Sequence, residues 1–145
     1  MACKSLDVAN AFVLAGVPTL TPMKIQKLVY FAHGWCLALS GQPLIDEEFE
    51  AWTHGPVVPA IYHAFKHYGA AVVDQPSRRG TSAVPAELTP LINRIIRRYG
   101  HLSGFTLSEL THKENSAWSR VYGSQHCTID NRLITADFKA VLKDG

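Results

Sequence analysis

The sequence predicts a mainly α-helical fold of about six helices with one small β-hairpin. Most segments repeat apolar residues at helical spacing, and several begin with a capping residue followed by proline and end at glycine. One stretch, residues 43–53, instead alternates with a period near two. A chain of 145 residues is long enough for a substantial core, so we expect residues 1–145 to form a single domain.

The segment 21–41, TPMKIQKLVYFAHGWCLALSG, is predicted to be the central core helix. Thr21 is a good N-cap, Pro22 suits the first helical position and Gly41 is a natural left-handed stop. Few polar residues remain on the rest of its circumference, and a helix that is apolar on most sides is normally buried. The residues that define its apolar face are Ile25, Leu28, Val29, Ala32, Trp35, Cys36 and Leu39.

Two further helices are expected in the N-terminal half. The first covers residues 7–15, with Ser5 or Asp7 as its cap. The second covers residues 56–69 and must start at its prolines, because proline is tolerated only in the first turn of a helix. Its expected buried stripe is Val58, Ile61, Tyr62, Phe65 and Tyr68.

The C-terminal half is also predicted to be helical. Residues 89–99 begin with threonine and proline and should form one helix. Thr106 opens a T-x-x-E capping box for a short helix. Asn115 or Ser116 can cap a further turn, and Thr135 is expected to cap the last helix.

The predicted hairpin lies between the central helix and the helix expected at residues 56–69. Residues 43–45 and 49–53 are its strands, and the acidic residues 46–48 form its corner. Such short strands do not form a sheet that stands alone, so the hairpin is expected to lie against the helices. Residues 70–85 contain turn formers and charge without periodicity, which predicts a mobile loop with a short extended piece at 71–73.

Composition excludes several classes of protein. The net charge of +2 is too weak to indicate a nucleic-acid or anionic-membrane partner. The first twelve residues lack the apolar stretch of a signal peptide, and the three widely spaced cysteines fit reduced thiols in the cytoplasm. The polar residues that make the central helix unsuitable as a membrane span are Lys24, Gln26, Lys27 and His33.

Two pairs of residues suggest a metal site or a catalytic thiol. His63 and His67 stand one helical turn apart, but Ala64 occupies the position where an HExxH motif needs glutamate. His126 and Cys127 are adjacent, and neighbours rarely face each other as a thiol and its base must. A solvated helix face and an incidental thiol are the favoured interpretations, with no metal and no cofactor, and a metal- or thiol-dependent enzyme stays as an alternative.

The only concentrations of basic residues are Arg78 with Arg79 and Arg94 with Arg97 and Arg98. No exposed aromatic residues are interleaved with them, so a solvated helix face is favoured over a nucleic-acid surface. Phosphate-binding glycine motifs and nucleophile elbows are absent from the sequence.

Several bulky or polar residues stand at the junctions between elements, away from core spacing. They are Trp52, Pro56, His112, Glu114, Asn115 and Trp118. Trp118 is expected to anchor a short helix in the core, although junction aromatics also suit a protein-binding surface. The residue pattern leaves both interpretations open.

The run LTPMKIQKLVYFAHGWCLALSGQPLIDEEFEAWTHGPVVPAIYHAFKHYG resembles the core of the Panacea domain family, the SocA-like or GepA-like antitoxin domain. The segment LSELTHKENSAW resembles the family's L-x-x-x-T-H-x-E-x-x-x-W motif. The resemblance extends from about Asp7 to the final helix. One departure is Ala117, where members commonly have proline before the tryptophan.

The resemblance implies a non-enzymatic antitoxin of a bacterial or prophage toxin–antitoxin pair. Such proteins neutralise a cognate toxin, encoded by an adjacent gene, through direct protein–protein binding. One branch of the family instead delivers its toxin to an AAA+ protease as an adaptor, which is the alternative mechanism. Some members carry an added helix-turn-helix domain, and we expect no separate DNA-binding domain here because the motif begins close to the N-terminus.

The candidate toxin-binding residues are Tyr30, Trp52, His54, His112 and Trp118. All except Tyr30 lie near the GPVVP turn or the THKENSAW segment, and aromatic side chains commonly dominate the binding energy of an interface. On the central helix, Gln26, Tyr30 and His33 share one stripe, and we expect this stripe to reach a partner if any part of the helix does.

Overall fold

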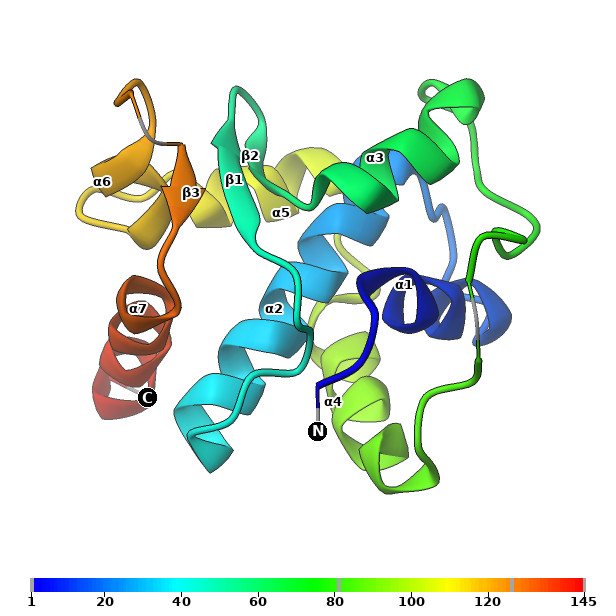
Figure 1. Ribbon diagram of the computed structural model, residues 1–145, viewed down its shortest axis with the longest axis horizontal. Coiled ribbons are helices and arrows are strands. Elements are labelled where there is room, and N and C mark those ends of the chain that lie inside the picture. The colour runs from blue at the N-terminus through cyan, green and yellow to red at the C-terminus, as the bar shows by residue number, and fades with distance from the viewer. Residues whose placement is uncertain (1, 81, 126, 145) are drawn as a thin grey trace.

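The central helix α2 spans Pro22–Ser40 and runs through the middle of the molecule (Figure 1). The computed structural model describes residues 2–80, 82–125 and 127–144. The hydroxyl of Thr21 accepts a hydrogen bond from the Lys24 N–H, and Gly41 takes the left-handed conformation with φ of 74°. Both ends of the helix are therefore those that the sequence predicts.

Other helices surround α2 and bury it on most sides. Those that pack directly against it are α1 (Ser5–Leu14), α3 (Pro59–Phe65), α4 (Thr89–Tyr99), α5 (Gly104–Thr111) and α7 (Asn131–Asp144). The short helix α6 (Ala117–Val121) lies against α5, α7 and the strands. The described chain thus has seven α-helices, in agreement with the expected mainly helical fold of about six, and two 3-10 turns at Lys66–Tyr68 and Ala86–Leu88. None of the helices in the described ranges is long and apolar enough to cross a membrane.

Four helix starts differ from the sequence prediction, that of α3 through the strand described below. Helix α1 begins at Ser5 with no side-chain cap, so neither Ser5 nor Asp7 caps it as expected. Helix α5 is capped by Ser103, whose hydroxyl accepts a hydrogen bond from the Thr106 N–H, so Thr106 lies inside the helix. Helix α7 begins about one turn earlier than expected, where the Asp130 carboxylate accepts from the Arg132 N–H. The hydroxyl of Thr135 donates to the carbonyl of Asn131 within the helix and caps nothing. In α5 and α7 a better acceptor precedes the predicted cap.

The predicted cap of α6 is confirmed. The hydroxyl of Ser116 accepts a hydrogen bond from the Ser119 N–H, as an N-cap side chain should.

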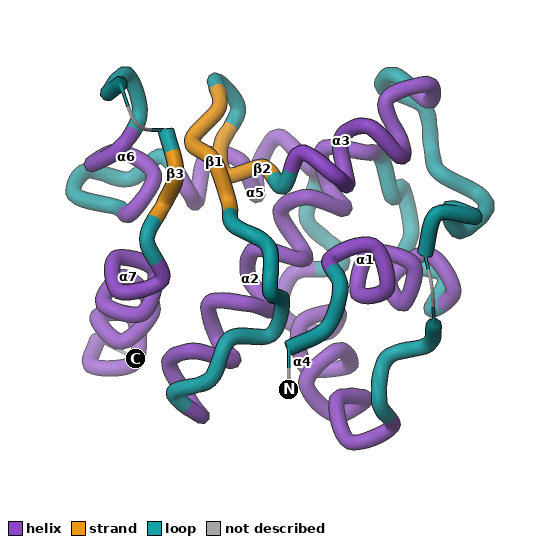
Figure 2. Tube along the Cα trace, viewed as in Figure 1, coloured by secondary structure: helices purple, strands orange, loops and turns teal. Residues whose placement is uncertain are grey.

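The sheet has three short strands in the order β2-β1-β3 (Figure 2). Strand β1 (Phe49–Trp52) pairs antiparallel with β2 (Gly55–Val57) and with β3 (Thr128–Ile129). The pairing of Trp52 with Gly55 leaves a two-residue hairpin loop, and Phe49 and Ala51 face the core while alternate residues are half-buried.

The hairpin is confirmed, but its strands are not those predicted. The partner of β1 follows it in the chain, whereas residues 43–45 pair elsewhere: Ile45 forms a parallel bridge with Cys3. The buried imidazole of His33 also holds this segment, because its Nδ1 accepts hydrogen bonds from the N–H groups of Leu44 and Ile45, both at 3.3 Å. The two backbone donors of this segment are thus used by α2, and the N-terminus takes the Leu44 carbonyl, which accepts from the Cys3 N–H.

Pro56 lies in β2, so α3 begins at Pro59 and not at Pro56 as expected. Proline is tolerated in this strand because β2 is at the edge of the sheet, where a missing N–H breaks no ladder.

The predicted loop 70–85 contains no strand in its described residues, and Thr81 lies outside them. The described part of this loop is hydrogen-bonded to the rest of the protein at separate residues. The Val73 N–H donates to the Leu20 carbonyl, and the Asn10 side chain exchanges two hydrogen bonds with the backbone of Ser77. Its described part is therefore fastened to α1 and to the segment that precedes α2.

Candidate functional site

Aromatic and histidine side chains from the hairpin, α3, α5 and the end of α6 gather on one part of the molecule. We call this set the aromatic surface, and its members are Trp52, His54, Tyr62, His112, Trp118 and Tyr122. Four of the five candidates from the sequence belong to it.

Trp118 lies at the centre of a stack of three rings. Its indole is parallel to the His112 imidazole, with centroids 3.9 Å apart, and to the Tyr122 phenol on the other side at 4.6 Å. The indole N–H donates to the main-chain carbonyl of Trp52 at 2.7 Å. Trp118 therefore joins α6 to the hairpin, as expected of an anchor, and its side chain stays half-buried.

Trp52 and Tyr62 form the other half of the aromatic surface. The Trp52 indole N–H donates to the Glu50 carboxylate at 2.8 Å, and its ring meets the Tyr62 ring edge to face at 5.0 Å. Tyr62 is 43% exposed, so the prediction that it belongs to the buried stripe of α3 is wrong. The buried Ala64 fills the core side of this short helix, which leaves Tyr62 to face outward.

A pocket of about 640 Å³ opens beside these rings. Its wall is formed by α2, the hairpin, α3 and Tyr122, and it is largely apolar and aromatic. We call it the Lys27 pocket after the one lysine in its wall. Its size is that of a typical binding pocket for a small ligand or an anchoring side chain.

Lys27 is 1% exposed, and its Nζ donates to the Pro56 carbonyl at 3.2 Å. Burial disfavours the ammonium form and lowers the pKa of Lys27 to about 7. The pKa of His112 is also lowered, first by burial and then by the charge of Lys27. The Nε2 atom of His112 is buried without a hydrogen-bond partner among the described residues.

Tyr30 does not belong to the aromatic surface, although the sequence made it a candidate. It is 2% exposed and packs edge to face against Phe49 and Phe138, with ring centroids at 5.1 and 5.7 Å. Burial raises the pKa of its phenol. A partner cannot reach this ring unless the core opens.

The whole stripe of Gln26, Tyr30 and His33 is buried, contrary to the expectation that it reaches a partner. Gln26 exchanges two hydrogen bonds with the backbone of Val58, and His33 Nε2 lies 2.9 Å from the Asn131 side-chain oxygen. Because Nδ1 of His33 accepts backbone hydrogen bonds, Nε2 carries the proton of a neutral ring. The stripe thus fixes the hairpin and α7 in place.

The structure places the residues of the other chemical candidates as follows. His63 and His67 are both exposed, and the helix tightens to a 3-10 turn between them. No group of three potential metal ligands occurs among the described residues. His126 lies outside those residues, while the main-chain carbonyl of Cys127 accepts from the Ala51 N–H within the sheet region.

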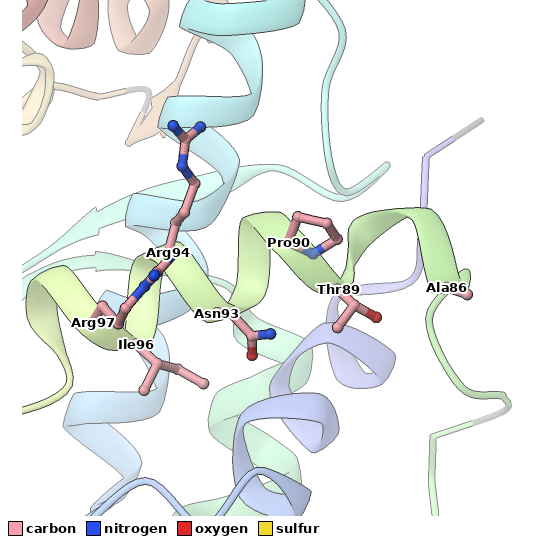
Figure 3. A pocket seen from close by; sticks show the side chains of 7 residues that line it. All are labelled: Ala86, Thr89, Pro90, Asn93, Arg94, Ile96 and Arg97. Atoms are coloured by element: carbon pink, nitrogen blue, oxygen red, sulfur yellow. The ribbon is translucent and has the colours of Figure 1, made fainter.

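Helix α4 carries the arginines on its exposed side, as predicted, and shallow pockets flank it. One of about 750 Å³ includes Arg94 and Arg97, which Figure 3 shows on the helix together with Ile96 and Asn93. Another of about 410 Å³ lies toward Trp35. The guanidinium of Arg98 lies 5.1 Å from the centroid of that indole, a cation–π contact. Helix α4 lies near the bottom of the view in Figure 1, whereas the hairpin loop is at the top.

Comparison with known proteins gives the chain a family. The family model described as Antitoxin SocA-like, Panacea domain matches residues 25–119, which is more than half of the chain. The chain belongs to the SocA-like Panacea family. It is also 29% identical to the Antitoxin SocA of Caulobacter vibrioides over 109 residues, which cover 68% of this chain and 58% of that protein. No solved structure matches.

The Panacea match begins in α2 and ends in α6, so it contains every member of the aromatic surface except Tyr122. Sequence reasoning missed Tyr62, Tyr122 and Lys27. The available signal for Lys27 was a lysine on a helix that is apolar nearly all round, which the sequence analysis used only against a membrane span. Tyr122 carried no comparable signal, because its place beside Trp118 depends on where α6 ends.

Proposed function

We propose that this protein is the antitoxin of a bacterial or prophage toxin–antitoxin pair and that it neutralises a protein toxin by direct binding. The proposal rests on its membership of the SocA-like Panacea family and on its similarity to the Antitoxin SocA of Caulobacter vibrioides. The toxin is expected to be the product of an adjacent gene. Inhibition by occlusion needs a rigid surface and requires no catalysis by this chain.

We choose the aromatic surface as the toxin-binding surface because its rings are rigid and partly exposed. Tyr62 and Tyr122 are 43% and 46% exposed, and both are held by ring contacts with buried or half-buried tryptophans. Rigid, partly exposed aromatic side chains next to a pocket are the usual anchors of protein–protein interfaces. An interface of standard size would use roughly 20 to 30 residues of this chain, with these rings near its centre.

The first test is co-expression with the adjacent gene. The wild-type chain should restore growth and co-purify with the gene product. A toxic neighbour that this chain neither rescues nor binds would overturn the proposal.

The second test locates the surface. Tyr62→Ala should weaken binding by about thirtyfold, since removal of an interface hot spot costs roughly 2 kcal/mol. The matched control is Leu14→Ala, because Leu14 is 72% exposed at the end of α1, away from the aromatic surface, and should leave the dissociation constant unchanged. Equal effects of the two substitutions would place the interface elsewhere.

The alternative is an adaptor that delivers the toxin to an AAA+ protease. One observation favours keeping it: the arginine-bearing pockets of α4 form a second surface that shares no lining residue with the Lys27 pocket. An adaptor must hold two partners at once and needs two such surfaces. It would shorten the half-life of the toxin only in cells with an intact protease, and an unchanged half-life would leave occlusion as the mechanism.

A further inference from the structure

Lys27 is a buried cation with too few acceptors. A lysine ammonium has three N–H donors, and among the described residues only the Pro56 carbonyl accepts from this one. A buried charge is costly unless it is paired and hydrogen-bonded. The free protein therefore holds an incomplete electrostatic site directly under the hairpin.

The fold makes room for this lysine. A Cβ atom on Gly55 would lie 2.6 Å from Lys27 Cε and 2.8 Å from Thr111 Oγ1, closer than real contacts allow. Gly55 also has a φ of 120°, which side-chain-bearing residues rarely adopt. The glycine of the hairpin is thus needed both for its backbone angle and for the position of the Lys27 side chain.

The described residues that line the pocket beside Lys27 include basic side chains and no acidic ones. Trp52, Tyr62 and Tyr122 supply aromatic walls, and His54 stands at the hairpin loop. No aspartate or glutamate is among the described residues that line the pocket. The wall is therefore complementary to a segment in which a negatively charged group stands next to an apolar one.

The titratable groups around Lys27 come from two elements. His112 and Glu109 lie on α5 and His54 lies in the hairpin loop, and the charges of Lys27 and His54 both lower the pKa of His112. Because burial lowers the pKa of Lys27 to about 7, the free side chain is close to half-protonated at neutral pH. An added carboxylate would favour the charged form.

We propose that the Lys27 pocket receives an acidic segment of the partner protein. The Lys27 side chain, which is buried in the free protein, turns toward the pocket that it lines and pairs its ammonium with a carboxylate of that segment, while the neighbouring apolar side chain lies against Trp52, Tyr62 and Tyr122. This inference deepens the proposed antitoxin function and rests on it. The partner completes the hydrogen bonding of a lysine that the free protein leaves with one acceptor.

The experiment is calorimetric titration of the wild-type chain and Lys27→Met with a purified, non-toxic variant of the adjacent gene product. Methionine keeps the volume of the stem and removes the charge. We expect Lys27→Met to fold and to bind at least about tenfold more weakly, since truncating one partner of a buried charge pair has effects of that size or larger. The control is Tyr62→Ala, which weakens binding but retains the lysine.

Proton uptake separates this role from a structural one. In the wild type, binding near pH 7 should take up about half a proton, and affinity should fall as the pH rises toward about 9. Lys27→Met should show neither effect, whereas Tyr62→Ala should keep both. Any proton uptake that remains in Lys27→Met would come from another group and not from Lys27.

The outcome that overturns the inference is a folded Lys27→Met that binds with unchanged affinity. If that variant does not fold, substituting each acidic residue of the partner with its amide decides the matter: one such change must weaken binding to the wild type and abolish proton uptake. If none does, no partner carboxylate is involved and the inference fails. Failure of the wild type to bind at all would instead overturn the proposed function.

Discussion

Two lysines of α2 are both buried, three residues apart, and the protein accommodates them in different ways. Lys24 is 0% exposed and its Nζ donates to the carbonyls of Pro18 and Gly100, at 2.7 and 2.6 Å, and to the Thr19 hydroxyl at 3.4 Å. Lys27 is 1% exposed and has the single acceptor described above. The first joins the start of α2 to the end of α4, whereas the second lies against the pocket and the hairpin.

Lys24 and Lys27 show how a buried cation that supports the fold differs from one that is able to bind a partner. Burial alone lowers the pKa of both lysines, so neither burial nor the direction of the shift distinguishes them. The number of hydrogen-bond acceptors around each ammonium distinguishes the two lysines. A charge with all its donors satisfied supports the fold, and a charge with unused donors beside a cavity is able to bind a partner.

The largest effect is expected for Lys24→Met. The substitution leaves the carbonyl of Gly100 buried without its donor, which should cost about 3 kcal/mol of the free energy of unfolding. Urea denaturation measures the loss, with Lys139→Met as the control because Lys139 is exposed on α7. A loss no greater than that of the control would mean that Lys24 does not stabilise the fold.

Gly55→Ala should be the next most damaging change. The new Cβ meets Lys27 and Thr111, and the φ of 120° adds backbone strain, so we expect a loss of roughly 2 kcal/mol. Gly16→Ala is the matched control. Gly16 also has a positive φ, 72°, but nothing lies within 4 Å of the added Cβ, so it should lose about half as much. Equal losses in thermal or urea denaturation would show that the Lys27 side chain moves freely out of the way.

The stability of the wild type should depend on pH above neutrality. The folded-state pKa of Lys27 lies below its unfolded value, so between about 7 and the usual lysine pKa the unfolded chain binds more protons and stability rises with pH. From pH 7 to pH 9 the gain should be about 2 kcal/mol, given about 1.4 kcal/mol per pKa unit. Lys24 contributes in the same direction, so the decisive quantity is the difference between the wild type and Lys27→Met. Parallel curves for the two proteins would contradict a depressed pKa at Lys27.

The smallest change is expected for the stability of Lys27→Met itself at pH 9. At that pH the wild-type amine is largely neutral and an apolar side chain of similar length replaces it. Only the Pro56 carbonyl loses a donor, whereas Lys24→Met removes the donor of two carbonyls, so the loss should be about 1 kcal/mol. The same denaturation series checks this. A loss as large as that of Lys24→Met would make Lys27 a second structural cation and remove the contrast between the two regions.

Much of the fold follows from local patterns in the sequence. The ends of α2 at Thr21 and Gly41, the whole of α4 and the cap of α6 at Ser116 are all as predicted, because capping and helical periodicity depend on residues a few positions apart. The presence of a small hairpin is equally local, since alternation in FEAW requires only that one face be buried.

The strand pairing and the pocket depend on contacts between distant parts of the chain. Residues 43–45 look as suitable as residues 55–57 for pairing with β1, and the choice is made by Cys3 and His33, which take up the backbone groups of the former. Tyr62 turns outward because Ala64 fills the core. Neither the pairing partner of β1 nor the outward orientation of Tyr62 can therefore be predicted from one segment of the sequence.

Local patterns along the chain are enough to predict the helical framework, the family and most members of the aromatic surface that we propose for binding. Packing is needed to see that Tyr30 is buried, that Trp118 stacks between His112 and Tyr122, and that Lys27 lies under Gly55 with one acceptor. This is because burial and hydrogen-bond satisfaction are properties of the packed molecule. A lysine on an apolar helix is a local observation, but whether its donors are used depends on residues nearly thirty positions away.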